Sequence, residues 1–503
     1  MEPIIKISQS APYTVPPSED ELAAIVAAIR VYIEKPEVAR KETKPSVWGK
    51  VARWEAVGTA SDTRKAGGSL WSLVLALALS VNAAMAQTAI ASIATRPAVS
   101  QGKSIRVLLA TGPRMELDFP DGASIYTLAD GALVGRINPL SSWSMTLAAS
   151  RPALQLAARN NASKFDATAN NFVSVAFTPR TASPQVDRYC LPLTASAGPD
   201  SDALDASQGY LLVAGRAEAD TARSNKEVAL FALGGKLYRG ALILRPTANN
   251  GISAINVLDL EDYLLSVVPS EVPSLWPAEV LKAQAVAARS YAVANLGKHR
   301  AEGYDVKATV DDQVYRGVIA EAEETNNAVA QTNGLVLKHN NQVISAFFHS
   351  TSGGSTELAE NVWGKPLPYL KSVVDYDDAS PQFNWKKTVN TATLAKSLGE
   401  DLLGVLVVGR HPGDSRRVKD VLLVGKTSAR LMSGADLRRT LNLPSTQFSL
   451  YQSDDMYIFS GRGSGHGLGL SQWGAKALAD NGYNALQILS YYYKDVTIES
   501  LTQ

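Results

Sequence analysis

The segment from Tyr263 to Gly297 constrains the fold of this chain more than any other, because it combines prolines at its start with an alanine-rich run. Pro277 suits the first turn of a helix, and Gly297 suits the position just past a helix end. The residues between them are mostly strong helix formers. The sequence therefore predicts a buried helix here, around which the rest of the chain is organised.

One carboxylate, Glu271, stands just ahead of this helix. An apolar run, residues 264–268, leads to it, and Pro269 and Pro273 restrict the backbone on either side. The pattern predicts that Glu271 is held stiffly in a short proline-bounded turn, which would suit a fixed acid. It fits equally well a loop at a helix entry, where the helix dipole favours a glutamate.

Length and composition leave room for an enzyme and argue against several other classes. The chain has 503 residues, enough for two or three domains that each have a core. Its 49 Lys and Arg residues nearly balance its 48 Asp and Glu residues, so no net field attracts nucleic acid or an anionic membrane. Cys190 is the only cysteine, which excludes an intramolecular disulfide and a zinc site built from several cysteines.

A targeting segment is predicted near the start of the chain. No charged residue occurs between Lys65 and Arg96, and the apolar core at residues 70–86 ends in Ala-Met-Ala. A basic flank, an apolar core and such an ending are typical of a secretory signal, with cleavage before Gln87. Everything after about residue 96 is therefore expected to be extracytoplasmic, in the periplasm or cell wall.

The same segment has two alternative interpretations. Residues 69–94 are long enough to remain as a single membrane anchor, and they could also form a buried core helix. We assign residues 64–95 to the signal peptide or anchor and residues 1–63 to a short extension ahead of it. Signals normally lie at the start of a chain, so translation from a valine such as Val51 or Val57 is a further alternative.

Between residues 100 and 248 the pattern changes to short apolar runs of period two, separated by turn signals. The predicted strands are residues 104–110, 123–130, 172–179, 210–215, 228–233 and 237–246. Titratable groups do not cluster in this region. It is predicted to be a β-rich accessory domain that supports the fold or binds glycan.

Residues 250–503 have a mixed pattern and are assigned to one catalytic domain. Helices are predicted at residues 320–331, 392–403 and 433–443 and at a segment ending near Gly482, and a hairpin is predicted with Asn340 and Asn341 at its tip. Residues 391–450 look like an embedded α/β portion. The predicted fold class is α+β: a mixed α/β catalytic core, a preceding β-rich domain and an N-terminal signal or anchor helix.

A glycine-rich loop, residues 461–469, contains Arg462 and His466 and leads into the last of these helices. It fits neither the dinucleotide nor the P-loop signature, so nucleotide binding is not expected. Gln472 and Trp473 add an amide and an aromatic face that suit a pyranose ring, which favours a sugar-contacting loop. A tightly packed structural turn is the alternative.

Two further polar clusters complete the set of candidates. His349 precedes Ser350, Thr351 and Ser352, but the G-x-S-x-G elbow of a serine hydrolase is missing, and no zinc-binding spacing links His349 to His466. The other cluster contains Asp311, Asp312, Gln313 and Tyr315, and it also fits a capping turn. Polar loops beside well-patterned elements are how a cleft is built on a scaffold.

Four motifs together resemble the sporulation stage II protein D family, also called the SpoIID/LytB domain. They are PSEVPSLWPAEVLKAQAVAARSYAVAN from Pro269, DDQVYRG from Asp311, FFHSTSGGST from Phe347, and GRGSGHGLGLSQWGAKALADNGYNALQILSYYYKD from Gly461. The resemblance covers roughly residues 250–500 and keeps the order of the family's motifs. It implies a bacterial cell-wall protein that cleaves peptidoglycan glycan strands as a lytic transglycosylase, with a preference for strands stripped of their peptides.

The resemblance also implies roles for individual residues. Glu271 matches the catalytic acid of the family, and its chemistry needs only one carboxyl group, which acts first as acid and then as base. The residues expected to line the sugar groove are Gln284, Arg289, Tyr291, Gln313, Tyr315, His349, Ser352, Arg462, His466 and Gln472. Gln284 and Arg289 fit equally well as buried polar anchors.

Other properties of the family bear on cofactors and partners. Some members bind zinc through cysteines, which this region lacks, so no cofactor is expected. Other members enhance cell-wall amidases instead of cutting glycan, which keeps open a non-catalytic glycan-binding module with an amidase as its partner. Nucleic acid is not expected as a partner.

Overall fold

The computed structural model describes the part of the chain that follows residue 102, with gaps. The described ranges are 103–120, 122–128, 133–137, 141–147, 154–158, 172–176, 188–192, 210–214, 230–247, 251–399 and 402–501. The extension at residues 1–63 and the signal or anchor predicted at residues 64–95 lie outside them. Within these ranges, no helix combines the length and apolar character needed to span a bilayer.

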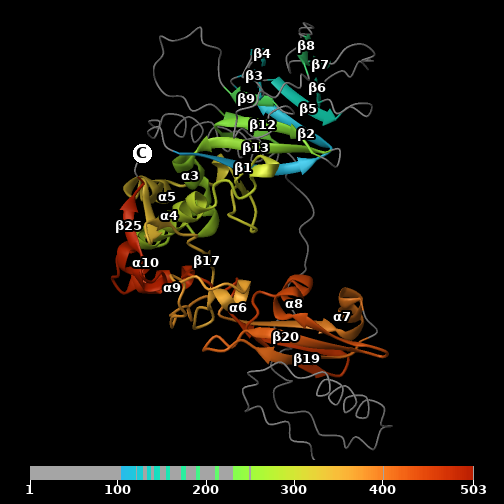
Figure 1. The fold of residues 1–503 in the computed structure, drawn as a ribbon, viewed down its shortest axis with the longest axis vertical. Helices are drawn as coiled ribbons and strands as arrows, with labels where there is room; N and C mark the ends of the chain where they lie inside the picture. The colour runs from blue at the N-terminus through green and yellow to red at the C-terminus, as the bar shows by residue number, and fades with distance from the viewer. Residues whose placement is uncertain are drawn as a thin grey trace, which may run out of the picture.

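Two seven-stranded sheets form one end of the molecule (Figure 1). The first contains, in spatial order, β14 (Val306–Lys307), β1 (Ser104–Gly112), β13 (Ile252–Asp259), β12 (Ala241–Pro246), β9 (Tyr210–Ala214), β3 (Ala123–Thr127) and β4 (Leu133–Ile137). The second contains β11 (Lys236–Arg239), β10 (Leu230–Leu233), β2 (Arg114–Phe119), β5 (Ser141–Leu147), β6 (Leu154–Ala158), β7 (Phe172–Ala176) and β8 (Arg188–Pro192). Each of the six runs predicted as strands overlaps at least one of these strands, which confirms the β-rich pattern.

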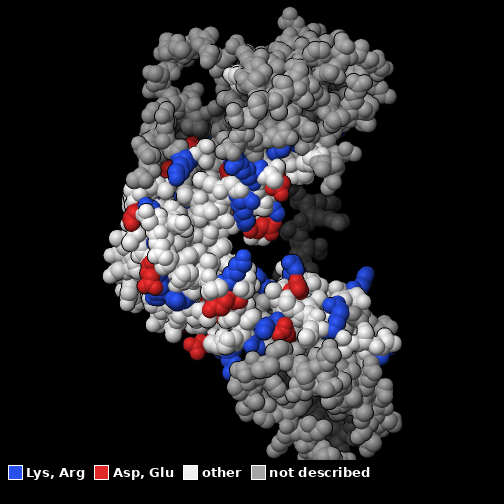
Figure 2. Space-filling model, in the orientation of Figure 1, with Lys and Arg blue, Asp and Glu red and all other residues white. Residues whose placement is uncertain are grey.

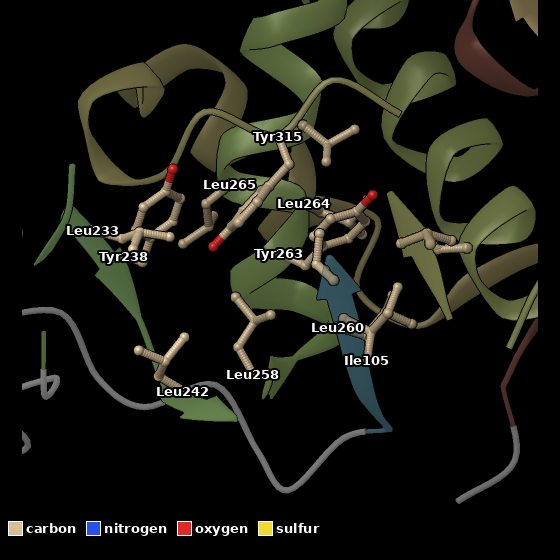
Figure 3. Packing of buried hydrophobic residues seen from close by; sticks show 14 of the residues in the cluster. Ile105, Leu233, Tyr238, Leu242, Leu258, Leu260, Tyr263, Leu264, Leu265 and Tyr315 are labelled. Carbon is tan, nitrogen blue, oxygen red and sulfur yellow. The ribbon is translucent and has the colours of Figure 1, made fainter. Parts of the chain in front are cut away.

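Strand β13 joins the β-rich half to the helical half. It pairs antiparallel with β1 on one side and with β12 on the other. One hydrophobic core contains side chains of β1, β2 and β12 together with side chains of the helices that follow β13. Figure 3 shows part of this core, where Ile105 and Leu258 from strands lie near Tyr263, and Leu242 lies farther along the same core. The boundary placed between residues 248 and 250 therefore runs through one sheet and one core.

Helix α3 (Leu260–Glu271) follows β13 directly and corrects the prediction of a proline-bounded turn. The Asp259 carboxylate caps it by accepting the Glu261 N–H at 2.8 Å. Pro269 lies inside the last turn, so the helix continues through it and ends at Glu271. The apolar run that we expected to lead into a turn is instead the buried face of a helix, because tertiary packing outweighs the local effect of one proline near a helix end.

Helix α4 (Ala278–Ala294) confirms the predicted buried helix. Leu281, Ala285 and Ala288 face the core shared with the sheets, whereas Val280 and Ala283 face a second core. That second core is completed by residues of α9 (Gln472–Asp480) and α10 (Ala485–Tyr492). The alanines are needed because a helix packed on both faces leaves little room for large side chains.

Shorter elements surround α4. They are η3 (Arg300–Glu302), η4 (Val318–Ala320), α5 (Glu323–Gln331), β15 (Leu335–His339), β16 (Gln342–Val343), β17 (Phe348–His349), α6 (Ala359–Trp363), β24 (Leu470–Ser471) and β25 (Thr497–Ser500). The predicted hairpin is confirmed, since β15 pairs with β16 and both Asn340 and Asn341 have positive φ at its tip. The helix predicted at residues 320–331 is confirmed as α5.

A separate lobe is inserted between β17 and β24 (Figure 1). It contains β18 (Asn384–Asn390), α7 (Thr391–Leu398), β19 (Leu402–Arg410), β20 (Val418–Gly425), β21 (Ala429–Ser433), α8 (Gly434–Leu441), β22 (Phe448–Ser453) and β23 (Met456–Arg462). It has its own hydrophobic core. The helix predicted at residues 392–403 stops at Gly399, whose φ of 72° ends α7. Figure 2 shows the molecule hollowed between this lobe and the rest, with Lys and Arg side chains on both sides of the hollow.

Candidate active site

The Glu271 side chain lies where α3 ends, between three segments that are far apart in the sequence. The Val314 N–H donates to its Oε1 at 2.9 Å. The Gln472 side chain, on the first residue of α9, forms a second hydrogen bond, and the Arg316 guanidinium acts on the carboxylate through its charge. Glu271 and Gln472 are therefore brought together as the sequence predicts, while Val314 and Arg316 are additional neighbours.

Burial raises the pKa of the Glu271 carboxyl above its ordinary value. The Val314 N–H, the Gln472 side chain and the Arg316 charge each lower this pKa, but their combined effect is smaller than that of burial. The carboxyl group thus keeps its proton to a higher pH than an exposed glutamate does. This is the state that a general acid needs.

The C-terminal motif reaches Glu271 through a short parallel pairing of β17 with β24. Ser471 caps α9 by accepting the Gly474 N–H, and the Trp473 N–H donates to the Ser350 carbonyl at 3.1 Å. The Trp473 ring packs edge-on against Trp276 with the ring centroids 5.0 Å apart. These contacts fix the start of α9 beside the segment that follows Glu271.

The glycine-rich loop is packed against the strand that carries His349. A side chain at Gly465, where φ is 109°, would place Cβ 2.7 Å from the His349 Cβ. At Gly469, with φ of 67°, Cβ would lie 2.0 Å from the Phe347 carbonyl oxygen. The loop glycines are therefore required for close packing, which favours the tightly packed turn over direct sugar contact along the loop itself.

Arg289 is a buried anchor. Its side chain is 0% exposed, and its Nε and Nη2 donate to the two oxygens of Glu261 at 2.6 and 2.7 Å. Its Nη1 also donates to the Leu335 carbonyl at 3.1 Å. Of the two interpretations of Arg289, the structure supports the anchor, because a guanidinium without exposed surface cannot line a groove. Gln284 is likewise fully buried, and neither of its amide atoms has a hydrogen-bond partner among the described residues.

Three further predicted residues support the loop that carries Val314. The Gln313 amide donates to the Ala288 carbonyl at 3.3 Å and accepts from the Tyr263 hydroxyl. The Tyr315 hydroxyl donates to Asn256 Oδ1 at 2.9 Å, and the Tyr291 hydroxyl donates to Asp312 Oδ1 at 2.9 Å. All three side chains are buried, so they position the loop instead of facing a groove.

His349 and His466 lie beside each other with ring centroids 5.5 Å apart. Burial, the neighbouring His466 and Arg417 lower the pKa of His349 well below its ordinary value. Burial and the nearby Arg417 and Arg438 lower the pKa of His466 to about 3, although part of its surface reaches solvent. Both imidazoles are therefore neutral near pH 7 and act as polar or packing groups, not as cations.

Ser352 and Arg462 lie toward the inserted lobe. The buried Ser352 hydroxyl donates to Asp375 Oδ2 at 2.6 Å, and the Ser352 carbonyl accepts from Arg417 Nη2 at 2.9 Å. In the described part of the chain, the partners of this hydroxyl are carboxylates and not a histidine. The Arg462 guanidinium is exposed and lies 5.6 Å from the centroid of Phe383.

Comparisons with known proteins agree with the motif resemblance. Residues 248–339 match the family described as Stage II sporulation protein, SpoIID. The stage II sporulation protein D of Bacillus subtilis (strain 168) is 34% identical over 283 residues, which are 53% of this chain and 81% of that protein. This chain belongs to the stage II sporulation protein D family.

Two other relatives extend the comparison. The stage II sporulation protein D of Bacillus amyloliquefaciens is 35% identical over 272 residues, which are 50% of this chain and 76% of that protein. A protein of Bacillus subtilis (strain 168) named amidase enhancer is 31% identical over 292 residues, which are 47% of this chain and 40% of that protein. The family that the four motifs predict is therefore confirmed.

The resemblance implies that some members of the family bind zinc through cysteines. Residues 248–339 of this chain contain no cysteine, because Cys190 lies outside them. Within the described ranges, no group of three or more His, Cys, Asp and Glu side chains could hold a metal ion.

Sequence reasoning missed two features of the site. Asp375 and Asp377 form a buried pair that holds Ser352 and the Gly353 and Gly354 N–H groups. Burial and the Asp377 charge raise the pKa of Asp375 to about 6. Arg316 was also missed, although it belongs to the DDQVYRG motif and is the one residue there whose charge acts on Glu271.

Proposed function

We propose that this protein is an extracytoplasmic peptidoglycan lytic transglycosylase that uses Glu271 as its acid and base. It cleaves glycan strands between N-acetylmuramic acid and N-acetylglucosamine and leaves 1,6-anhydromuramic ends. Residues 250–503 carry the chemistry, and the β-rich region at residues 100–248 supports it. The proposal rests on one half-buried carboxyl group with a raised pKa, which lies where three family motifs meet.

The proposed reaction has two proton transfers. Protonated Glu271 donates its proton to the glycosidic oxygen as the bond to C1 of the muramic ring breaks. The resulting carboxylate then takes the proton from the 6-hydroxyl of the same ring while that oxygen bonds to C1. Glu271 is protonated again at the end, so the reaction consumes no water and needs no second carboxylate.

The surroundings of Glu271 support both steps. Burial favours the protonated form before cleavage, whereas the Val314 N–H, Gln472 and Arg316 stabilise the carboxylate after it. In the described part of the chain, the groups that shift the pKa of Glu271 do not include a carboxylate. A single acid that can exist in both states is what this reaction requires.

Replacement of Glu271 by glutamine tests the proposal. Because a positioned general acid contributes about 10²–10⁴ in rate, Glu271→Gln should lose at least a hundredfold in the release of anhydro-disaccharides from peptide-stripped glycan, measured by mass spectrometry. The pKa of Glu271 is raised in the folded state, so the ionised carboxylate lowers stability as pH rises through that pKa. A neutral glutamine should therefore leave thermal unfolding at neutral pH unchanged or at a higher temperature.

Glu324→Gln is a matched control, because Glu324 is exposed in the first turn of α5. It should keep the parent rate. Release of anhydro products by Glu271→Gln at the parent rate would rule out Glu271 as the acid.

A second candidate function is activation of a cell-wall amidase by a glycan-binding protein. It is favoured by the similarity to the relative named amidase enhancer. The two functions differ in what the purified protein does alone. Anhydro ends formed from peptide-stripped glycan support the transglycosylase, whereas binding without product, together with faster hydrolysis by an added amidase, supports the activator.

A further inference from the structure

Arg316 is an exposed cation close to Glu271. Among the described residues, its guanidinium has no ion-pair or hydrogen-bond partner, unlike the buried Arg289 and Arg239, which are each paired with a glutamate. Its charge nevertheless acts on the Glu271 carboxylate. A free guanidinium beside the proposed reaction centre is available to bind an anionic group of a ligand.

The backbone that leads to Arg316 is fixed. The Val314 N–H donates to Glu271, and the Arg316 N–H donates to the Ser266 hydroxyl on α3 at 3.1 Å. Tyr315 lies between them, with its ring centroid 5.1 Å from that of Tyr263 and 5.7 Å from that of Tyr238 (Figure 3). The position of Arg316 relative to the end of α3 is therefore set before any ligand binds.

Gly317 closes this segment on the other side. Its φ is 78°, and a Cβ there would lie 2.2 Å from the Leu237 carbonyl oxygen. The loop therefore packs closely against strand β11, while the side chain of Arg316 is exposed. Such preorganisation reduces the entropy that is lost when a ligand is bound.

The chemistry of the proposed substrate suggests which anion this is. The muramic ring that reacts at C1 also carries a lactic acid, in ether linkage at O3. In a strand stripped of its peptides this acid is a free carboxylate, whereas in an intact strand it is an uncharged amide. A guanidinium binds a carboxylate with two parallel hydrogen bonds and has no comparable interaction with an amide.

We propose that Arg316 binds the free lactyl carboxylate of the muramic ring at the cleavage site and so determines the specificity for peptide-stripped strands. This inference rests on the proposed glycan substrate. It gives Arg316 a role in substrate selection in addition to its effect on the Glu271 carboxylate.

The test compares two ligands that differ only in this carboxylate. One is a peptide-stripped glycan strand with free lactyl carboxylates, and the other is the same strand after its carboxylates have been converted to methylamides. Binding is measured in the Glu271→Gln background, so that neither ligand is cleaved. Hydrogen bonds to charged groups contribute about 1.5–3 kcal/mol, so the free strand should bind about tenfold to a hundredfold more tightly than the amidated strand.

In the same background, Arg316→Gln should reduce this preference to within about twofold and leave the affinity for the amidated strand unchanged. Arg316→Lys should keep an intermediate preference that salt weakens, since it retains the charge without the planar fork. Arg114→Gln is the control: Arg114 is an exposed arginine on β2, 62% exposed in its side chain, and its loss should keep the full preference.

Two results would overturn the inference: an Arg316→Gln protein that keeps the preference, or one that loses affinity for both strands equally. The latter would show a structural role. Failure of the proposed function is recognised separately, because parent protein that binds the free strand but forms no anhydro ends would refute the lytic reaction while the binding ratio still tests Arg316.

Discussion

At the scale of single residues, the acidity of Glu271 depends on a balance between burial and three stabilising groups. Burial raises its pKa, while Val314, Gln472 and Arg316 each lower it. The proposed mechanism needs the proton before bond cleavage and the carboxylate after it. The partners of Glu271 should therefore determine the pH range of activity as well as the maximal rate.

Replacement of Gln472 should change the pH dependence of the reaction. The side chain of Gln472 stabilises the Glu271 carboxylate, so Gln472→Leu should raise the pKa of Glu271. Since the general acid must be protonated, kcat/KM should fall as pH rises through that pKa, and the falling limb should move to higher pH in the variant.

The measurement is kcat/KM for anhydro-end formation from about pH 4 to pH 9. Gln342→Leu, at an exposed position in β16, should reproduce the parent profile. A profile for Gln472→Leu that drops in height with an unmoved limb would show that Gln472 binds substrate and does not adjust the acid.

At the scale of elements, the Arg289–Glu261 ion pair fixes α4 against α3, the helix that ends in Glu271. Both side chains are buried, and Arg289 also reaches the Leu335 carbonyl at the start of β15. This ion pair and hydrogen bond therefore fix the positions of α3, α4 and β15 relative to one another. A shift of either helix would move Glu271 relative to Val314 and Gln472.

Loss of Arg289 should destabilise the protein. Arg289→Met leaves the Glu261 carboxylate buried without its partner, which typically costs about 3–5 kcal/mol, measured here as a fall in the free energy of unfolding in urea. The double variant Glu261→Leu/Arg289→Met removes both charges and should recover part of that loss. A single variant as stable as the parent but weaker in glycan binding would instead favour the groove interpretation of Arg289.

At the scale of the whole molecule, the inserted lobe is attached through a small number of segments. Its first and last strands pair with each other, with Asn384 opposite Arg462, so the chain enters and leaves at one place. Its core shares no residue with the two cores that surround α4. Buried Arg417 links it to the rest by donating to the Ser352 carbonyl.

A fragment of residues 384–462 should fold without the rest of the chain, because paired ends and a separate core are properties of an independent domain. Circular dichroism and a cooperative urea transition would report folding. A fragment without a cooperative transition would show that contacts such as Arg417 with Ser352 are required for the lobe to form.

Much of this molecule could be predicted from local sequence. The alanine-rich helix, the hairpin at Asn340 and the strands before residue 248 depend on periodicity and turn residues, which act over a few positions. Glu271 was identified as the acid candidate from its motif. The helical state of residues 260–271 was not predicted, because Pro269 suggested a turn and the packing of Leu264 against distant strands decided otherwise.

The family, the candidate acid and the types of residue that could surround it follow from local sequence motifs. Which of these residues lie near Glu271 depends on the tertiary fold. Arg289 belongs to a motif but forms a buried ion pair with Glu261. Val314 and Arg316 lie near the Glu271 carboxyl because the loop that carries them is hydrogen-bonded to α3. Burial and long-range pairing set both the pKa and the accessibility of a side chain, and they depend on contacts between segments that are far apart in the sequence.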